Sequence, residues 1–227
     1  MVNRKVAVLR ADASSSIGVG HVMRSLSLGE ALLDAGFGVE LVSFELAPSL
    51  QSLATSCGVE VVELSCAPRS SEDAQFVLQR NANIVVVDGY EFSREFFAGL
   101  EASSTPFAII DDNAETNAQS PSAVINQNPH ASVSMYAHLQ GEPKMLLGLQ
   151  YAMVRKEVRE VAAMNLPSRE GEVFLAMGGA DFLGLTAPLV EALAETGLQI
   201  RVAVGHANTQ RAHIQKLADQ LGNVTLI

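Results

Sequence analysis

The sequence predicts an α/β protein with a Rossmann-like parallel sheet, followed by an incomplete second domain of the same class. Short apolar, β-branched runs alternate with longer stretches of helical periodicity, as in a doubly wound sheet. Several of these runs are apolar at every position, which is typical of strands covered on both faces. The first run leads into a glycine-rich turn and a helix, the usual opening of such a fold.

The first domain is expected to span residues 1–150. Its apolar runs predict strands at residues 6–9, 39–43, 59–62, 84–87, 107–110 and 123–126. The periodicity between them predicts helices at residues 21–35, 48–57, 71–82, 93–103 and 130–138. Most connections between these elements are short, as in parallel βαβ units.

The pattern changes near residue 150. A charged amphipathic helix is expected at residues 151–164, and residues 151–167 are expected to link two domains. Residues 168–227 would form the second domain, with strands at 173–177, 199–204 and 224–227 and helices at 185–196 and 209–221. Three strands make a thin sheet, so we expect this domain to be incomplete. Its unpaired edge favours pairing with another chain, in a homo-oligomer.

Composition narrows the classes of partner. The chain has 227 residues, 48% of them hydrophobic, and a formal net charge of −10. That charge argues against nucleic acid or an anionic membrane surface as a partner, although a local group of donors can still bind a small anion. No apolar run approaches the ~20 residues of a membrane span, and no signal peptide is recognisable. Cys57 and Cys66 lack metal-site spacing, which predicts reduced thiols in a cytoplasmic protein.

The segment RADASSSIGVGHVMR, residues 10–24, holds the first candidate site. Gly18 and Gly20 allow a ligand to approach the main chain closely, and the N–H groups of the following helix would face it. His21 would begin that helix, where the dipole disfavours the charged imidazole, so that the ring can accept a proton from water. A packing turn with a capping histidine is the alternative. The spacing G-x-G-H is not the dinucleotide fingerprint, so no dinucleotide cofactor is expected.

Asp12 and serines 14–16 flank the same turn. Asp12 could orient His21 or hydrogen-bond a sugar hydroxyl. Aspartate and serine in a loop also commonly cap the backbone, and the residues alone leave both interpretations open.

Polar residues follow three further strands. Asp88 and Tyr90 end one strand, and Asp111 and Asp112 end the next, at the sheet edge where open α/β proteins bind ligands. Adjacent carboxylates usually point apart, so Asp111 and Asp112 predict no metal site without a third ligand. Amides at residues 126–128 could bind sugar groups or simply form a turn before a proline.

In the second domain, a strand runs into Gly178 and Gly179, with Asp181 near the start of the next helix. This turn could offer backbone N–H groups to an anion or could serve only the chain reversal. The histidines at positions 130, 138, 206 and 213 show no partner pattern.

Six segments together resemble one enzyme family. They are RADAS with GVGHVMR (10–24), VDGY (87–90), IDD (110–112), NQN (126–128), LGLQYAMVR (147–155) and MGGAD (177–181). In this order they are similar to the SpsG-like hydrolases of the pseudaminic-acid pathway, which release UDP from UDP-2,4-diacetamido-2,4,6-trideoxy-β-L-altropyranose. The resemblance covers nearly all of the chain. It implies the two-domain GT-B fold, similar to MurG, and a UDP-sugar substrate.

The resemblance also implies roles for individual residues. His21 would be the general base that activates water for inverting attack at the anomeric carbon, with UDP as the leaving group. Gly20 would lie beside the diphosphate or sugar, and Tyr90 would contact the substrate. The Gly178–Gly179 turn would frame the cleft from the second domain. Neither a metal nor a cofactor is implied. Asp12, Gly18, Arg24 and Asp181 lie in the matched segments, and we assign them to substrate binding.

Two alternatives remain open at this stage. Gly89 and Gly184 stand where the family typically has histidine and asparagine, and the family's C-terminal nucleotide-binding segment has no counterpart among residues 1–227. These differences favour a non-catalytic sugar-nucleotide-binding module. A GT-B glycosyltransferase, which moves the sugar to an acceptor alcohol, is the second alternative.

Overall fold

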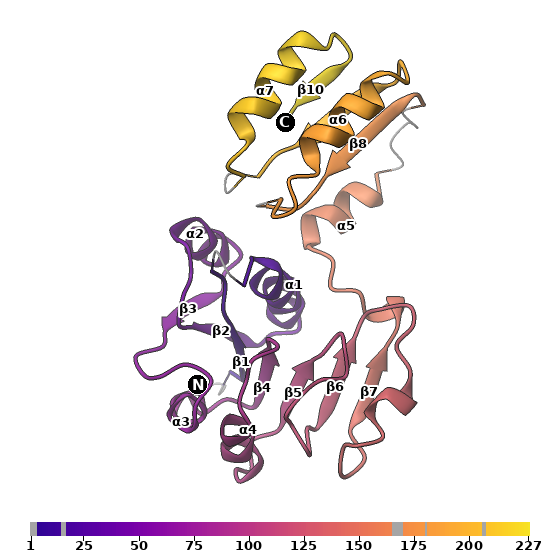
Figure 1. The fold of residues 1–227 in the computed structure, drawn as a ribbon. Coiled ribbons are helices and arrows are strands. Elements are labelled where there is room, and N and C mark those ends of the chain that lie inside the picture. Colours follow the sequence, from indigo (N-terminus) through magenta and orange to yellow (C-terminus); the bar gives the residue numbers. More distant parts are fainter. Residues whose placement is uncertain (1–3, 15–16, 165–169, 180, 206–207) are drawn as a thin grey trace. The chain divides into compact units, whose positions relative to one another are not determined.

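The structure is a computed structural model that describes residues 4–14, 17–164, 170–179, 181–205 and 208–227. It divides into two compact units, Met1–Ala163 and Met164–Ile227. Each unit contains its own parallel sheet, shown in Figure 1.

The first unit is built on a seven-stranded sheet with the order β3-β2-β1-β4-β5-β6-β7, in which all neighbouring strands are parallel. Its strands are β1 (Val6–Ala11), β2 (Gly38–Ser43), β3 (Glu60–Glu63), β4 (Ile84–Asp88), β5 (Phe107–Ile110), β6 (Ala123–Asn126) and β7 (Lys144–Leu147). The chain runs outward from β1 to β3 and then crosses back to β4, so the strand order reverses between β1 and β4. This reversal creates a crevice at the carboxyl ends of those two strands.

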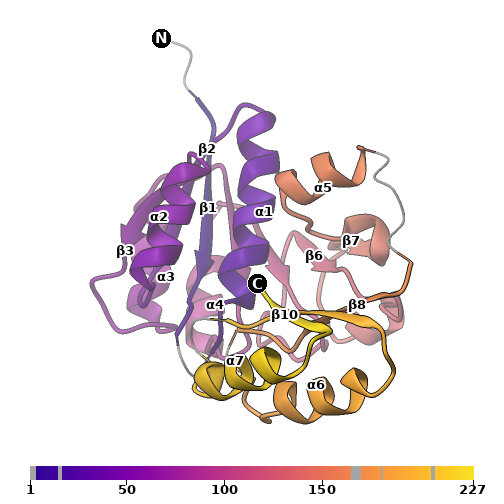
Figure 2. The same ribbon diagram turned by 90° about the horizontal axis from the view of Figure 1, so that it is seen from above.

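Helices cover both faces of this sheet, as Figures 1 and 2 show. The helices are α1 (Gly20–Asp34), α2 (Pro48–Ser56), α3 (Ser71–Leu78) and α4 (Arg94–Glu101). Val22 and Leu26 of α1 pack with Leu9 and Leu41 of the sheet. Alternate strand residues, which include Val8 and Val85, face the opposite way and pack with residues of α3 and α4. The fully apolar strands follow from this double coverage.

Local signals explain where individual helices begin. The Ser70 hydroxyl accepts a hydrogen bond from the Asp73 N–H, and the Ser93 hydroxyl accepts one from the Phe96 N–H. Both serines therefore satisfy N–H groups that the first turn of a helix leaves unpaired. Pro48 occupies the first turn of α2, where the missing N–H of proline has no cost.

The second unit has a parallel sheet in the order β10-β9-β8. Its elements are β8 (Glu172–Ala176), α6 (Thr186–Ala194), β9 (Gln199–Ala203), α7 (Arg211–Gln220) and β10 (Val224–Leu226). Val190 of α6 and Ile214 of α7 share one core with Ile200 and Val202 of β9. Within the described part of this unit, both helices thus cover the same face, and Phe174 of β8 is 65% exposed.

Three elements differ from expectation. Strand β7 was not predicted, because KMLL is short and contains no β-branched residue. The helix expected at 130–138 is only a 3₁₀ turn, η1 (Val133–Tyr136). The helix expected at 151–164 is interrupted: a 3₁₀ turn, η2 (Leu149–Tyr151), precedes the shorter helix α5 (Lys156–Ala162).

Candidate active site

The candidate site lies at the point where the strand order of the first unit reverses. Ala11 of β1 pairs in register with Asp88, the last residue of β4. The chain leaving β1 forms the glycine-rich turn and enters α1 at Gly20. Parallel strand ends therefore bring Asp88 beside the first turn of α1, although the two segments are far apart in the sequence.

His21 and Asp88 form the centre of the site. The Nδ1 atom of His21 lies 2.7 Å from Oδ1 of Asp88, and both side chains are almost fully buried. A carboxylate can only accept hydrogen bonds, so this contact places the imidazole proton on Nδ1. Arg24 Nη2 lies 3.1 Å from the same nitrogen, but it donates to Asp88 Oδ1 at the shorter distance of 2.6 Å, so the carboxylate is the hydrogen-bond partner of Nδ1. The Nε2 atom is then the ring nitrogen with a free lone pair.

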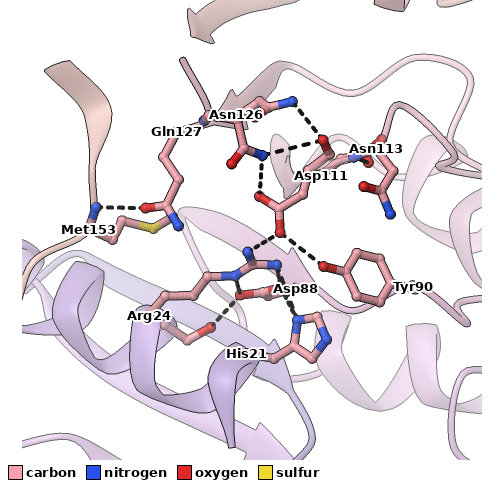
Figure 3. A network of polar contacts seen from close by, with 12 residues as sticks. His21, Arg24, Asp88, Tyr90, Asp111, Asn113, Asn126, Gln127 and Met153 are labelled. Carbon is pink, nitrogen blue, oxygen red and sulfur yellow. Dashed lines mark hydrogen bonds and ion pairs between the residues drawn. The ribbon is translucent and has the colours of Figure 1, made fainter. Parts of the chain in front are cut away.

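Arg24 lies one turn after His21 on α1 and connects two carboxylates (Figure 3). Its Nε donates to Asp88 Oδ2 at 2.5 Å and its Nη2 donates to Asp88 Oδ1 at 2.6 Å. Its Nη1 donates to Oδ2 of Asp112. The side chain is only 12% exposed, and these two partners raise the pKa of Arg24 despite its burial. Arg24 thus fixes the orientation of the carboxylate that in turn orients His21.

Asp112 extends this network to Tyr90. The Tyr90 hydroxyl donates to Oδ2 of Asp112 at 2.9 Å, and the Tyr90 ring meets the His21 ring edge-on with centroids 4.7 Å apart. Burial opposes ionisation of Asp112, but hydrogen bonds from Arg24 and Tyr90 hold its pKa below the ordinary value. Burial, and then the bond to Asp112, raise the pKa of Tyr90.

The neighbouring Asp111 has a different role. Its carboxylate accepts hydrogen bonds from the main-chain N–H groups of Asn113, Ala114 and Thr116, so it shapes the loop after β5. The buried Tyr136 hydroxyl donates to the Asp111 carbonyl at 2.6 Å, and burial raises the pKa of Tyr136 to about 12. The two adjacent carboxylates therefore have separate partners. Within the described ranges, no group of three or more His, Cys, Asp or Glu side chains could hold a metal ion.

Two clefts meet at His21. The first, here called the Asp12 cleft, has a volume of about 390 Å³ and is lined by residues that include Asp12, Ile17, Phe44, Arg69 and Tyr90. The second, here called the Arg24 cleft, has a volume of about 620 Å³. It is lined by residues that include Gly20, Arg24, Gln127, Met153 and Arg155. His21 borders both, so a ligand in either cleft lies beside this residue, although His21 is only 7% exposed.

Asp12 does not orient His21, which corrects one of the two roles expected for it. Its Oδ1 accepts hydrogen bonds from Arg10 Nη1 at 2.6 Å and from the Phe44 N–H at 2.8 Å. Arg10 also forms a bidentate pair with the buried Asp73, with its Nε donating to Oδ1 and its Nη2 donating to Oδ2. The physical reason is position: Asp12 faces the buried guanidinium of Arg10, whereas the end of β4 supplies the histidine's partner.

The glycines of the turn leave open space. Gly18 has a φ of +81°, which favours glycine, and its N–H donates to the Ser14 carbonyl. A Cβ atom placed on Gly18 or Gly20 would meet nothing within 4 Å. Serines 15 and 16, expected to flank the turn, lie outside the described residues.

In the second unit, the glycine turn after β8 is also open. A Cβ on Gly178 or Gly179 would meet no atom within 4 Å, and Gly178 has a φ of +78°. The Asp181 carboxylate accepts hydrogen bonds from the N–H groups of Leu185 and Thr186 at the start of α6. A hydrogen bond from the Thr186 side chain lowers the pKa of Asp181 most, and the main-chain bonds lower it further. Asp181 therefore serves as a helix cap.

The partnership of His21 with Asp88 is the feature that sequence reasoning missed. Asp88 was recognised at a strand end, but it was not assigned to the site. The signal that could have found it is topology, because the strand after the crossover is the one that pairs with β1 in this strand order.

Among the described residues, no helix has the length and apolar character needed to cross a membrane.

A known hydrolase is similar in sequence to most of this chain. The chain is 28% identical over 222 residues to the UDP-2,4-diacetamido-2,4,6-trideoxy-β-L-altropyranose hydrolase of Campylobacter jejuni. The aligned region covers 96% of this chain and 76% of that protein. No family model matches the chain. The resemblance found from the ordered motifs is thereby confirmed in a curated relative.

Solved structures give the same fold. MurG of Acinetobacter baumannii is similar with a TM-score of 0.54 and 14% identity, over 99% of this chain and 67% of that chain. A glycosyltransferase of Rickettsia africae has a TM-score of 0.59 and 12% identity, over 99% of this chain and 68% of that chain. The UDP-N-acetylglucosamine 2-epimerase of Rickettsia bellii has a TM-score of 0.56 and 9% identity, over 99% of this chain and 69% of that chain. The chain thus has the expected α/β, GT-B-like fold, and its sequence is similar to that of a sugar-nucleotide hydrolase.

Proposed function

We propose that this protein hydrolyses a UDP-linked 2,4-diacetamido-2,4,6-trideoxy sugar, releasing UDP and the free sugar. The similarity to the Campylobacter hydrolase supports the substrate class. The GT-B-like fold supports a sugar-nucleotide ligand. The reaction is proposed to need neither a metal ion nor a cofactor.

The contact between His21 and Asp88 carries this proposal. Asp88 accepts the Nδ1 proton of His21 at 2.7 Å, which leaves Nε2 to take a proton from another molecule. The ring borders two clefts, so a water molecule bound beside a sugar can approach it. A neutral imidazole held by a carboxylate is a common arrangement for a general base.

The proposed step is a direct displacement. A water oxygen attacks the anomeric carbon, C1, as Nε2 of His21 takes one proton from that water. The bond between C1 and the diphosphate oxygen breaks, and UDP leaves with the electron pair. The configuration at C1 is inverted because water and UDP occupy opposite faces. Asp88 stabilises the imidazolium that forms, and Arg24 holds Asp88 in place.

The remaining assignments are proposals about binding. Gly18 and Gly20 would let the substrate approach the start of α1, whose N–H groups favour negative charge. Tyr90, beside the His21 ring, would contact the sugar. In the second unit, Gly178 and Gly179 would offer main-chain donors to the substrate, and Asp181 would fix the helix that follows them. Asp12 and Arg24 would also belong to the substrate-binding residues.

Reaction in H₂¹⁸O tests the proposal, with UDP and the sugar analysed by mass spectrometry. Attack at C1 places one ¹⁸O atom on the released sugar and none on UDP. Label on UDP would contradict attack at C1. If UDP appears only when an acceptor alcohol is added, the protein is a glycosyltransferase. If the sugar nucleotide binds but no UDP is released, the protein is a binding module.

A further inference from the structure

The Asp12 carboxylate is held rigidly through one oxygen, while its second oxygen lacks a hydrogen bond. Oδ1 accepts hydrogen bonds from Arg10, from Phe44 and, at 3.3 Å, from the Ser43 hydroxyl. Within the described part of the chain, the buried Oδ2 atom has no hydrogen-bond partner. Arg69 Nη2 forms an ion pair with Oδ2 at 3.6 Å, a distance that is too long for a hydrogen bond.

A buried oxygen without a donor is costly, and it is more so when it is charged. Asp12 is 4% exposed. Burial opposes its ionisation, but the bonds from Arg10 hold its pKa below the ordinary value, so the carboxylate is charged at neutral pH. Asp12 lines the cleft that His21 also borders. The missing donor is therefore one that a ligand in this cleft can supply.

The missing donor indicates which part of a sugar nucleotide can occupy the Asp12 cleft. The Asp12 cleft is lined by four carboxylates and one arginine, namely Asp12, Glu45, Asp88, Glu91 and Arg69. Arg10 pairs with Asp12 and Arg24 pairs with Asp88, so hydrogen-bonding capacity decides the matter. An ionised diphosphate has only acceptor oxygens and cannot supply the donor that Oδ2 of Asp12 lacks. The Arg24 cleft, which His21 also borders, is lined by Arg155 and by Arg24, which is already paired with Asp88 and Asp112. Among the described residues, no carboxylate lines this cleft.

The lining of the Asp12 cleft also suits an uncharged sugar with methyl groups. Ile17, Phe44, Pro68 and Phe92 provide apolar surface beside the carboxylates. The volume of about 390 Å³ lies within the ~300–1,000 Å³ range of small-molecule sites. Acetamido N–H and hydroxyl groups are donors of the kind that Asp12 lacks.

We propose that the sugar of the substrate occupies the Asp12 cleft, with an N–H or O–H group donating to Oδ2 of Asp12, and that the diphosphate remains outside this cleft. This inference rests on the proposed function and deepens it, because it makes Asp12 a residue that determines which sugar binds. It also fixes the direction in which the substrate lies across His21. The anomeric carbon, at the junction of sugar and diphosphate, then lies next to the base.

Titration of the full chain with two ligands tests this inference. The ligands are the free sugar, 2,4-diacetamido-2,4,6-trideoxy-altropyranose, and UDP, each followed by NMR. Asp12→Asn keeps an oxygen for Arg10 and the Phe44 N–H but presents an NH₂ group where Oδ2 lies. Because a hydrogen bond to a charged group is lost, we expect sugar affinity to fall about 10- to 100-fold. UDP affinity should change less than about threefold.

Asp73→Asn is the matched control. Asp73 binds the same Arg10 guanidinium but does not line the cleft, so this variant should keep the sugar affinity of the unmodified protein. Unchanged sugar affinity in Asp12→Asn would overturn the inference. Equal losses of sugar affinity in both variants would also overturn it, because they would indicate a role only in holding Arg10.

The same titration separates this inference from the proposed function. An unmodified protein that binds the free sugar through Asp12 but releases no UDP from the sugar nucleotide would contradict hydrolysis and support the inference. A protein that releases UDP but has sugar affinity independent of Asp12 would support hydrolysis and contradict the inference.

Discussion

The Nδ1 atom of His21 lies 2.7 Å from Oδ1 of Asp88, although the two residues are 67 positions apart in the sequence. The strand order brings them together, because β1 and β4 are neighbours whose carboxyl ends lie side by side. Arg24 binds both oxygens of the same carboxylate. This geometry fixes the tautomer and the orientation of the imidazole at the same time, which a general base requires.

Asp88→Asn should lower kcat by about 10²–10⁴-fold with little change in KM. An amide can donate to Nδ1 and would then favour the tautomer with its proton on Nε2, which cannot act as a base. Rates of UDP release over a range of substrate concentrations give kcat and KM, and a thermal unfolding curve shows whether the variant is folded. Ser25→Ala is the control, since its hydroxyl reaches Asp88 Oδ2 only at 3.5 Å. An Asp88→Asn variant with unchanged kcat would show that Asp88 does not set the tautomer.

Asp112 should make the protein less stable in acid. Its pKa is lowered in the folded state, despite burial, by Arg24 and Tyr90. The resulting stabilisation is complete above its unfolded pKa of about 3.9 and is lost as the pH falls through the lower, folded value. Asp112→Asn should therefore have a smaller loss of unfolding free energy between pH 5 and pH 2, measured by urea titration. Parallel curves for the two proteins would contradict this.

Tyr90 should act through its ring more than through its hydroxyl. Tyr90→Phe keeps the edge-on contact with His21 and loses only the bond to Asp112, so kcat/KM should fall less than about threefold. Tyr90→Ala removes the ring and should lower kcat/KM by about tenfold, since such aromatic contacts contribute ~0.5–1.5 kcal/mol. Equal losses in the two variants would instead assign the effect to the hydroxyl.

The two glycines of the first turn should respond differently to alanine. Gly18 has a φ of +81°, so Gly18→Ala should destabilise the fold by about 1 kcal/mol. Gly20 begins α1 and has open space around it, so Gly20→Ala should fold with unchanged or slightly higher stability. Because Gly20 lines the Arg24 cleft, the added methyl group should narrow that cleft and raise KM. An unchanged KM in Gly20→Ala would mean that the substrate does not approach the start of α1.

Much of the fold could be predicted from the sequence, and the reason is physical. Strands β1, β4 and β5 are apolar at nearly every position because helices cover both faces, and that pattern is visible in residues alone. Strand β7 was missed because its position depends on pairing with β6 rather than on its own residues. The expected helix at 151–164 did not form in full, because its periodicity carried no information about the turn at Leu149–Tyr151.

The site could be predicted only in part. His21, Arg24 and Tyr90 were found from the glycine turn, the strand ends and the resemblance, and the structure brings them together. Asp12 was expected as a possible partner of His21 because it is close in sequence, yet the buried Arg10 holds it instead. The partnership with Asp88 depends on strand order, which local sequence patterns do not determine. Gly178, Gly179 and Asp181 belong to the second unit, and their part in binding is a proposal.

The rate of UDP release by His21→Ala is the most direct test of the central claim that this imidazole takes the proton from water. The variant should keep its unfolding midpoint and its affinity for the sugar nucleotide, while kcat falls at least about 10³-fold because the base is lost. His21→Gln, which replaces the imidazole with a polar amide that cannot accept the proton, should be equally slow. Turnover by His21→Ala at the rate of the unmodified protein would contradict the account.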